Sequence, residues 1–217
     1  MSADLRVVDD PAGEVAALLD ATDGHVVLTG GSTPRRTYER CDGDWSRKTV
    51  WFCDDRCVGP EDERSNYRMA RGALLVRVET TVRRIEGELG PREAADRYDA
   101  AIRAELGDAP EFDLLLLGMG PDTHVASLFP GKPAVRERER LAVAVPDAGM
   151  EPYVPRVTMT LPVLNGARRL VVLVTGADKA EAVARAFGEN AQPDPEVPAS
   201  LLENPVVYLD AAAAGRL

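Results

Sequence analysis

The chain has 217 residues, 45% hydrophobic and 29% charged, a composition typical of a soluble globular protein with one sizeable core. Lys and Arg total 26 against 36 Asp and Glu, which gives a formal net charge of −10. This balance argues against nucleic-acid binding, although a small anion can still bind to a local cluster of cations. The N-terminus has no apolar signal-peptide core, and no apolar run is long enough to span a bilayer. We therefore expect one cytoplasmic domain, residues 1–217, with no membrane attachment.

Short runs of β-branched and aliphatic residues predict strands, which in chain order cover 25–30, 49–54, 112–118, 141–146, 156–160, 168–176 and 205–210. Apolar residues at helical spacing predict helices over 91–106 and 178–187, the second with Asp178 as a candidate cap. Pro34 and Pro91 suit first helical turns, and the proline-rich segment 188–200 suits a loop. Strand runs without polar alternation are typical of parallel strands buried on both faces. The pattern predicts an α/β fold, a doubly wound, mostly parallel, Rossmann-like sheet flanked by helices.

The three cysteines, Cys41, Cys53 and Cys57, are too few and too unevenly spaced for a disulfide framework. Cys53 and Cys57 lie close enough in sequence to suggest a zinc site, but the chain has only two histidines to complete it. We therefore expect reduced thiols in the core and no bound metal.

Polar motifs follow four of the predicted strands at the point where each strand ends. They are Thr-Gly-Gly-Ser-Thr-Pro (29–34), Asp-Asp-Arg (54–56), Gly-Met-Gly-Pro-Asp-Thr-His (118–124) and Gly-Ala-Asp-Lys (176–179). In open α/β sheets, ligands bind beyond the carboxyl ends of the strands. The four motifs together therefore predict one shared site.

Residues 29–34 have the composition of a phosphate cradle. Gly30 and Gly31 allow close backbone approach, Ser32 and Thr33 add hydroxyls, and a helix begins near Pro34. The Gly-Lys-Ser/Thr ending of a P-loop is missing. An ordinary turn between a strand and a helix remains the alternative interpretation.

Three cations occupy positions from which they can reach an anion at this site. Arg56 ends the Asp-Asp-Arg motif, Arg156 begins a predicted strand, and Lys179 falls in the first turn of a helix, where a cation opposes the helix dipole. Asp54 and Asp55 can orient a cation or a histidine, or cap a turn. Ser65 is expected to cap the helix that follows.

His124 is the candidate general base, because it follows a strand in a glycine-rich turn with Asp122 close by. The turn nearly matches a dinucleotide-binding fingerprint, but Thr123 replaces its third glycine. No serine elbow is present, since Ser127 lacks the flanking glycines. His25 begins a strand, at the far end from the motifs, and is expected to be structural.

The motifs resemble, in order and over nearly the whole chain, those of the 6-phosphogluconolactonase family, with "GMGPDTHVASLFPG" (118–131) the most specific element. The resemblance implies a NagB/RpiA-type fold and hydrolysis of 6-phospho-D-glucono-1,5-lactone to 6-phosphogluconate, without metal or nucleotide cofactor, by a monomer or weak homodimer. It implies that His124 is the general base and that Asp54 orients or polarises part of the site. It further implies phosphate binding by Gly30, Gly31, Ser32, Thr33, Arg56 and Lys179, an additional anion contact at Arg156, and oxyanion stabilisation by N–H groups near Gly118 and Gly120.

Two departures and two alternatives accompany this resemblance. The chain has Asp55 where the family usually has Glu, and Thr123 where it usually has Gly. Because a β-branched residue does not easily adopt a positive φ, we expect that position 123 does not need one here, or that the loop is shifted. A glucosamine-6-phosphate deaminase/isomerase would have Phe-Asn-Glu-Pro-Gly after the histidine, where this chain has Ser-Leu-Phe-Pro-Gly. A non-catalytic sugar-phosphate sensor is the second alternative.

Overall fold

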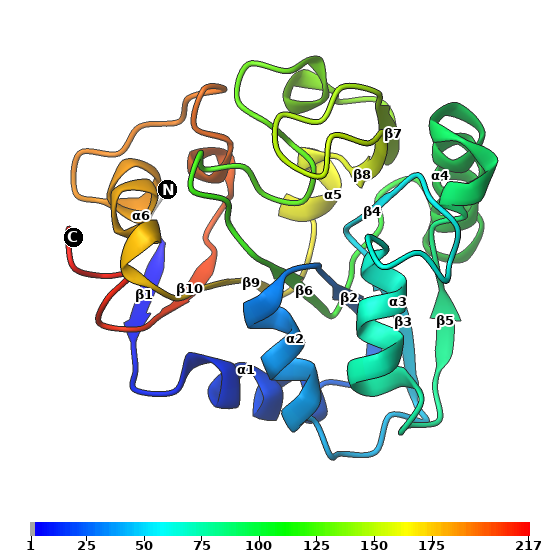
Figure 1. Cartoon of the computed structure of the whole chain (residues 1–217), viewed down its shortest axis with the longest axis horizontal. Helices are drawn as coiled ribbons and strands as arrows, with labels where there is room; N and C mark the ends of the chain where they lie inside the picture. Colours follow the sequence, from blue (N-terminus) through cyan, green and yellow to red (C-terminus); the bar gives the residue numbers. More distant parts are fainter. Residues whose placement is uncertain (1–2) are drawn as a thin grey trace.

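The computed structural model describes residues 3–217 (Figure 1). Its centre is a seven-stranded sheet in the order β1-β10-β9-β6-β2-β3-β5, and every neighbouring pair is parallel. The strands are β1 (Asp4–Val7), β2 (Gly24–Leu28), β3 (Lys48–Phe52), β5 (Thr81–Arg83), β6 (Leu114–Leu117), β9 (Leu170–Val174) and β10 (Val206–Leu209). From β2 the chain builds outward to β3 and β5, then returns to the other side of β2 with β6. The predicted doubly wound parallel sheet is confirmed, and its direction of growth reverses between β2 and β6.

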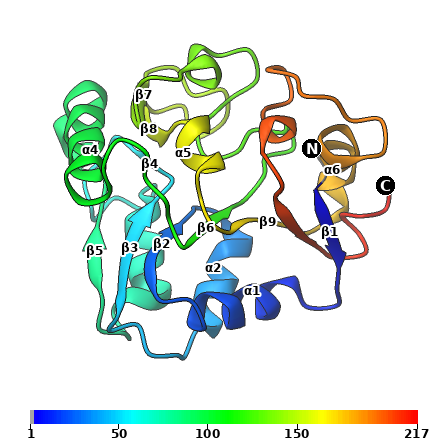
Figure 2. The same cartoon turned by 180° about the vertical axis from the view of Figure 1, so that it is seen from behind.

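The helices are α1 (Pro11–Asp20), α2 (Ser32–Arg40), α3 (Asn66–Ala70), α4 (Pro91–Leu106), α5 (Leu161–Asn165) and α6 (Ala180–Phe187). The prediction for 91–106 is confirmed. The second predicted helix begins later than expected, because a 3₁₀ turn, Ala177–Lys179, precedes α6 and contains Asp178. The Asp178 side chain therefore does not cap α6. Sequence reasoning missed α1, which packs beside α2 (Figures 1 and 2).

A second, smaller sheet lies beyond the carboxyl end of β3. It contains β4 (Asp54–Arg56), β8 (Arg156–Met159) and β7 (Ala142–Val145) in that order, with antiparallel pairing. The strands predicted around β7 and β8 therefore exist, but outside the parallel sheet. Because β4 begins two residues after β3 ends, the small sheet is anchored at the edge where the polar motifs were expected.

The core of the parallel sheet is apolar on both faces, as the unalternating strands predicted. All four residues of β6 and all five of β9 are buried. Tyr38 joins α2 to this core: its hydroxyl donates to the Thr29 carbonyl (2.8 Å) and accepts from the Thr29 N–H (2.9 Å). His25 lies on β2, where its Nδ1 accepts from the Trp51 indole (3.1 Å), so its structural role is confirmed.

Within residues 3–217 no helix combines the length and the apolar character needed to cross a membrane. The same residues contain no cluster of three or more His, Cys, Asp or Glu side chains arranged to hold a metal ion. Cys41 and Cys53 are buried, and burial raises the pKa of the Cys41 thiol to about 12.

Candidate functional site

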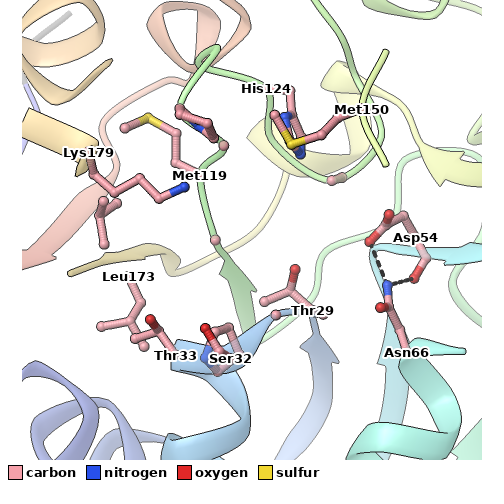
Figure 3. A pocket seen from close by; sticks show the side chains of 18 of the residues that line it. Thr29, Ser32, Thr33, Asp54, Asn66, Met119, His124, Met150, Leu173 and Lys179 are labelled. Atoms are coloured by element: carbon pink, nitrogen blue, oxygen red, sulfur yellow. Dashed lines mark hydrogen bonds between the residues drawn. The ribbon is translucent and has the colours of Figure 1, made fainter. Parts of the chain in front are cut away.

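A cavity of about 220 Å³ opens at the carboxyl ends of β2, β6 and β9, beside the small sheet (Figure 3). It lies where the order of the parallel strands reverses, which is the usual ligand position in doubly wound sheets. Every residue that the family resemblance placed in the site contributes to its lining: Gly30, Gly31, Ser32, Thr33, Asp54, Arg56, Gly118, Gly120, His124, Arg156 and Lys179. Sequence reasoning missed other lining residues, among them Asn66, Met150 and Thr175.

The open N-terminus of α2 forms one wall of the cavity. Gly31 is its N-cap with φ +111°, a conformation that favours glycine, and no side chain caps the helix. Gly30 must be glycine for a different reason, since a Cβ there would lie 2.0 Å from the Asn66 Oδ1. The Thr33 hydroxyl shares a 2.9 Å hydrogen bond with the hydroxyl of Thr175. The first turn of α2 therefore presents its positive end to the cavity.

Lys179 reaches the same wall from the turn after β9. The turn contains Gly176 at φ +100°, and the Gly176 N–H donates to both carboxylate oxygens of Asp210 (3.0 and 3.1 Å). The Lys179 side chain is 22% exposed and extends into the cavity above Ser32 and Thr33 (Figure 3). Its ion pair with the exposed Asp178 is long, at 3.9 Å. The ammonium group is therefore available to an anion bound at the start of α2.

His124 lies across the cavity, on the loop after β6. Its Nδ1 is 2.6 Å from the Asp122 Oδ1. Burial alone would raise the pKa of the Asp122 carboxyl, but the hydrogen bond to His124 and its charge outweigh this effect and lower the pKa. A carboxylate that accepts from Nδ1–H leaves the lone pair on Nε2, so Nε2 is the basic nitrogen. Gly120 makes room for this pair, because a Cβ there would lie 2.1 Å from the His124 Nδ1.

The role expected for Gly120 in oxyanion binding is not supported by this geometry. The Gly120 N–H donates to the His124 carbonyl at 2.9 Å, so it is already occupied within the loop. Gly118 lies in the cavity lining, and a Cβ there would make only ordinary contacts, the nearest at 3.8 Å from the Gly30 carbonyl oxygen. The structure therefore supports a close-packing role for Gly120 alone, where a Cβ would collide with His124.

Thr123 adopts the conformation that its side chain disfavours. Its φ is +74°, its side chain is fully buried, and its hydroxyl has no hydrogen-bond partner. The expectation that position 123 does not need a positive φ is therefore wrong. The Thr123 carbonyl accepts from the Ala199 N–H at 3.1 Å, which ties the loop to the end of segment 188–200.

The two adjacent aspartates of β4 have different partners. The Asp54 Oδ2 accepts from the Ser127 hydroxyl (2.6 Å) and its Oδ1 from the Asn66 amide (3.2 Å). Asp54 therefore holds the loop that carries His124, while Asp122 orients the imidazole. Asp55 points toward α3, where its carboxylate accepts from the N–H groups of Asn66 (2.7 Å) and Tyr67 (3.0 Å).

Asp55 and Ser65 are structural, as the capping interpretation of this segment predicted. Ser65 caps α3 by accepting from the Arg68 N–H at 3.1 Å. Burial raises the pKa of the Asp55 carboxyl to about 6, against the opposing effect of the N–H groups that it accepts from. The hydrogen bond between Asp54 and Ser127 could not be predicted from the sequence, because it joins two segments that lie far apart along the chain.

Two arginines lie side by side on the small sheet. Arg56 and Arg156 are register partners on β4 and β8, and among residues 3–217 neither forms an ion pair with a carboxylate. Arg56 donates to the Arg64 carbonyl (2.5 Å) and Arg156 to the Met150 carbonyl (2.8 Å), yet the Nε of each is buried without a partner. Burial lowers the pKa of Arg156, which is only 3% exposed. Two neighbouring like charges, each with a buried Nε that has no partner, indicate an anion-binding wall.

The cavity therefore combines a basic imidazole nitrogen, an open helix N-terminus and three cations within a strongly acidic chain. This arrangement can bind a dianion at one side while the imidazole removes a proton from water. The donor set lacks the thiolate or serine arrangement of a covalent mechanism, because Ser127 is engaged with Asp54.

Comparisons with known proteins agree with this description. Residues 7–208 match the family model described as "Glucosamine-6-phosphate isomerases/6-phosphogluconolactonase". The human protein named 6-phosphogluconolactonase is 42% identical over 178 residues, covering 78% of this chain and 68% of that protein. The Streptomyces coelicolor protein of the same name is 37% identical, covering 88% of this chain and 81% of that protein. The structure of 6-phosphogluconolactonase from Trypanosoma brucei superimposes with a TM-score of 0.84 at 26% identity, covering 100% of this chain and 99% of that one. The chain belongs to the glucosamine-6-phosphate isomerase/6-phosphogluconolactonase family.

Proposed function

We propose that this protein hydrolyses 6-phospho-D-glucono-1,5-lactone to 6-phosphogluconate, with His124 as the general base. The observation that carries the proposal is the Asp122–His124 pair, 2.6 Å apart, beside a cavity lined by Lys179 and by two arginines without a carboxylate partner. We infer that the chain acts as one domain, because the cavity draws residues from Thr29 to Lys179. The cytoplasmic location expected from the sequence is part of the same proposal.

The reaction needs one base and no covalent intermediate. His124 Nε2 removes a proton from a water molecule as the water oxygen attacks the lactone carbonyl. The C–O bond to the ring oxygen then breaks, and the imidazolium returns the proton to that oxygen. Asp122 stabilises the imidazolium while it carries the proton. A positioned general base contributes roughly 10²–10⁴-fold, which is a useful acceleration for an activated ester.

The phosphate is best accommodated at the first turn of α2, where Ser32, Thr33 and Lys179 converge. The N-terminus of the helix attracts the dianion, and Lys179 neutralises part of its charge. Arg56 and Arg156 line the cavity from the small sheet, where they are register partners on β4 and β8 and where β4 also carries Asp54. We infer that they provide further anion contacts, at the phosphate or at the carboxylate of the product.

The decisive experiment follows the disappearance of freshly prepared 6-phosphogluconolactone, with the buffer rate subtracted. We expect purified protein to accelerate hydrolysis, and to act far less efficiently on the unphosphorylated lactone. No acceleration over buffer would contradict the proposal and favour a sugar-phosphate sensor. Release of ammonia from glucosamine 6-phosphate would instead select the deaminase alternative, which the Ser-Leu-Phe-Pro-Gly sequence disfavours.

A further inference from the structure

Phe129 is a buried ring that contacts three parts of the site without lining the cavity itself. It is 1% exposed and belongs to the same loop as His124. The His124 ring lies against it, with centroids 4.7 Å apart and planes tilted by 41°. The guanidinium carbon of Arg156 lies 5.2 Å from the same ring centroid. One aromatic ring thus contacts both the base and an anion-binding arginine.

The third contact comes from the loop that carries Met150. Gly149 packs on the Phe129 ring so closely that a Cβ there would lie 2.9 Å from the ring Cδ1 and Cγ. Met150 forms part of the cavity wall near His124 (Figure 3), and its carbonyl accepts from Arg156 at 2.8 Å. The ring, the arginine and this loop therefore form one packed unit.

We propose that Phe129 is a positioning residue that holds His124 and Arg156 together in their working orientations. This inference rests on the proposed function, because it assigns the ring a task in that reaction. Asp122 fixes the imidazole only through Nδ1, so the ring could still rotate about that hydrogen bond. The face of Phe129 removes that freedom and directs Nε2 toward the cavity.

The same ring orients Arg156 without neutralising it. A carboxylate at this position would pair with the guanidinium and compete with the substrate anion. An aromatic face attracts the cation through its quadrupole and occupies none of its N–H donors. This explains how the arginine remains buried, unpaired by a carboxylate, and with its Nε still without a partner.

The test compares Phe129→Leu with Phe112→Leu. Phe112 is also a fully buried phenylalanine with an aromatic neighbour, Trp51, at 5.8 Å, but it does not line the cavity or contact its residues in this way. Both changes remove a ring from the core, so both should lower Tm. We expect Phe129→Leu alone to lower kcat at least tenfold and to weaken binding of 6-phosphogluconate, measured by calorimetry, at least threefold. Phe112→Leu should stay within twofold of the unmodified protein in both.

A second variant disturbs the ring without removing it. Gly149→Ala lies on an exposed part of its loop, so the fold should persist, but its Cβ must displace the Phe129 ring or the Met150 loop. We expect kcat to fall at least threefold, with Tm lowered less than in Phe129→Leu because the ring stays in the core. If Phe129→Leu is folded with normal kcat and product affinity, or if it does not fold and Gly149→Ala is kinetically normal, the proposal is wrong. Binding of 6-phosphogluconate requires no turnover. The proposed orientation of Arg156 by Phe129 can therefore be tested even if the protein shows no lactonase activity.

Discussion

The two sides of the cavity are built in different ways. The side formed by α2 and the turn after β9 uses glycine where the backbone has positive φ, at Gly31 and Gly176. The side formed by the loop after β6 and the small sheet places Thr123 and Ala126 at positive φ, +74° and +50°. Within residues 3–217, the buried side-chain polar atoms without a partner also belong to this side: Arg56 Nε, Thr123 Oγ1 and Arg156 Nε.

The difference suggests a division of labour. The first side can hold a phosphate with main-chain groups and one lysine, and it needs no unfavourable conformation to do so. The second side carries the base, and there unfavourable backbone conformations and unused donors are retained. Strain and unmet hydrogen bonds concentrate where a protein must act on a ligand, because relieving them would change the geometry of the site.

Removal of the base should have the largest effect and should leave binding intact. We expect His124→Ala to lower kcat about 10²–10⁴-fold, since a general base contributes that much, while KM changes little. Steady-state kinetics with the phosphorylated lactone measure both constants. Asp122→Asn is the companion variant: it keeps a hydrogen-bonding group near Nδ1 but cannot stabilise the imidazolium, so its kcat should lie between those of His124→Ala and the unmodified protein. A loss confined to KM in His124→Ala would place the base elsewhere.

Asp55 should make the folded protein less stable as the pH rises. Its pKa is about 6 in the folded protein and 3.8 as the reference value for the unfolded chain, because burial disfavours the charged form. Between these values the folded state binds more protons, so the free energy of unfolding should fall as pH rises from about 4 to 6, by up to about 3 kcal/mol. Denaturant unfolding across this range measures the slope. Asp55→Asn should remove this component of the slope, even if its overall stability is lower.

Lys179 tests the opposite side of the cavity. We expect Lys179→Ala to raise KM for the phosphorylated lactone about tenfold, as expected for loss of one charged hydrogen-bond donor, with kcat largely preserved. Kinetics on the unphosphorylated lactone should be unaffected. Asp178→Asn is the matched control, because it removes a neighbouring charge and leaves the ammonium group in place. A Lys179→Ala effect on kcat alone would break the proposed division between the two sides.

Much of the fold and the membership of the site could be predicted from the sequence. Long apolar strands such as those around Val26, Leu115 and Val172 show their burial directly, because parallel strands covered on both faces do not alternate. The strands that were missed are short and partly polar: β4 and β5 have three residues each, and β1 is an exposed edge strand. Such strands form because a neighbouring strand pairs with them, and the local sequence pattern does not show that pairing.

The site residues could be named because strand ends meet at one edge of the sheet, but their individual roles depend on tertiary contacts. Asp54 and Asp122 are equally plausible partners for His124 in sequence, and only the fold turns Asp54 toward Ser127. The place of Phe129 in the sequence predicts no particular role for its ring. Its position between His124 and Arg156 depends on a strand 27 residues further along the chain, Arg156–Met159.

Thr123 gives the smallest effect and tests the cost of the strained side. A non-glycine residue in the left-handed region costs roughly 1–2 kcal/mol, and a buried hydroxyl without a partner adds a similar penalty. Glycine would remove both, but it loses about 1 kcal/mol through greater freedom of the unfolded chain and forfeits the packing of one methyl group. We expect Thr123→Gly to be more stable by about 1 kcal/mol, which corresponds to a rise in Tm of roughly 2–4 °C for a chain of this size.

Thr123→Ala separates the two contributions, because it removes the unpaired hydroxyl and keeps a Cβ in the left-handed conformation. If backbone strain dominates, Thr123→Ala should gain little and Thr123→Gly should gain most. If the buried hydroxyl dominates, the two variants should have similar Tm values, since each removes that group. A Thr123→Gly protein that melts lower than the unmodified one would mean that the threonine packs well enough to outweigh its backbone, and the loop after β6 would then be no more strained than the turn at Gly176.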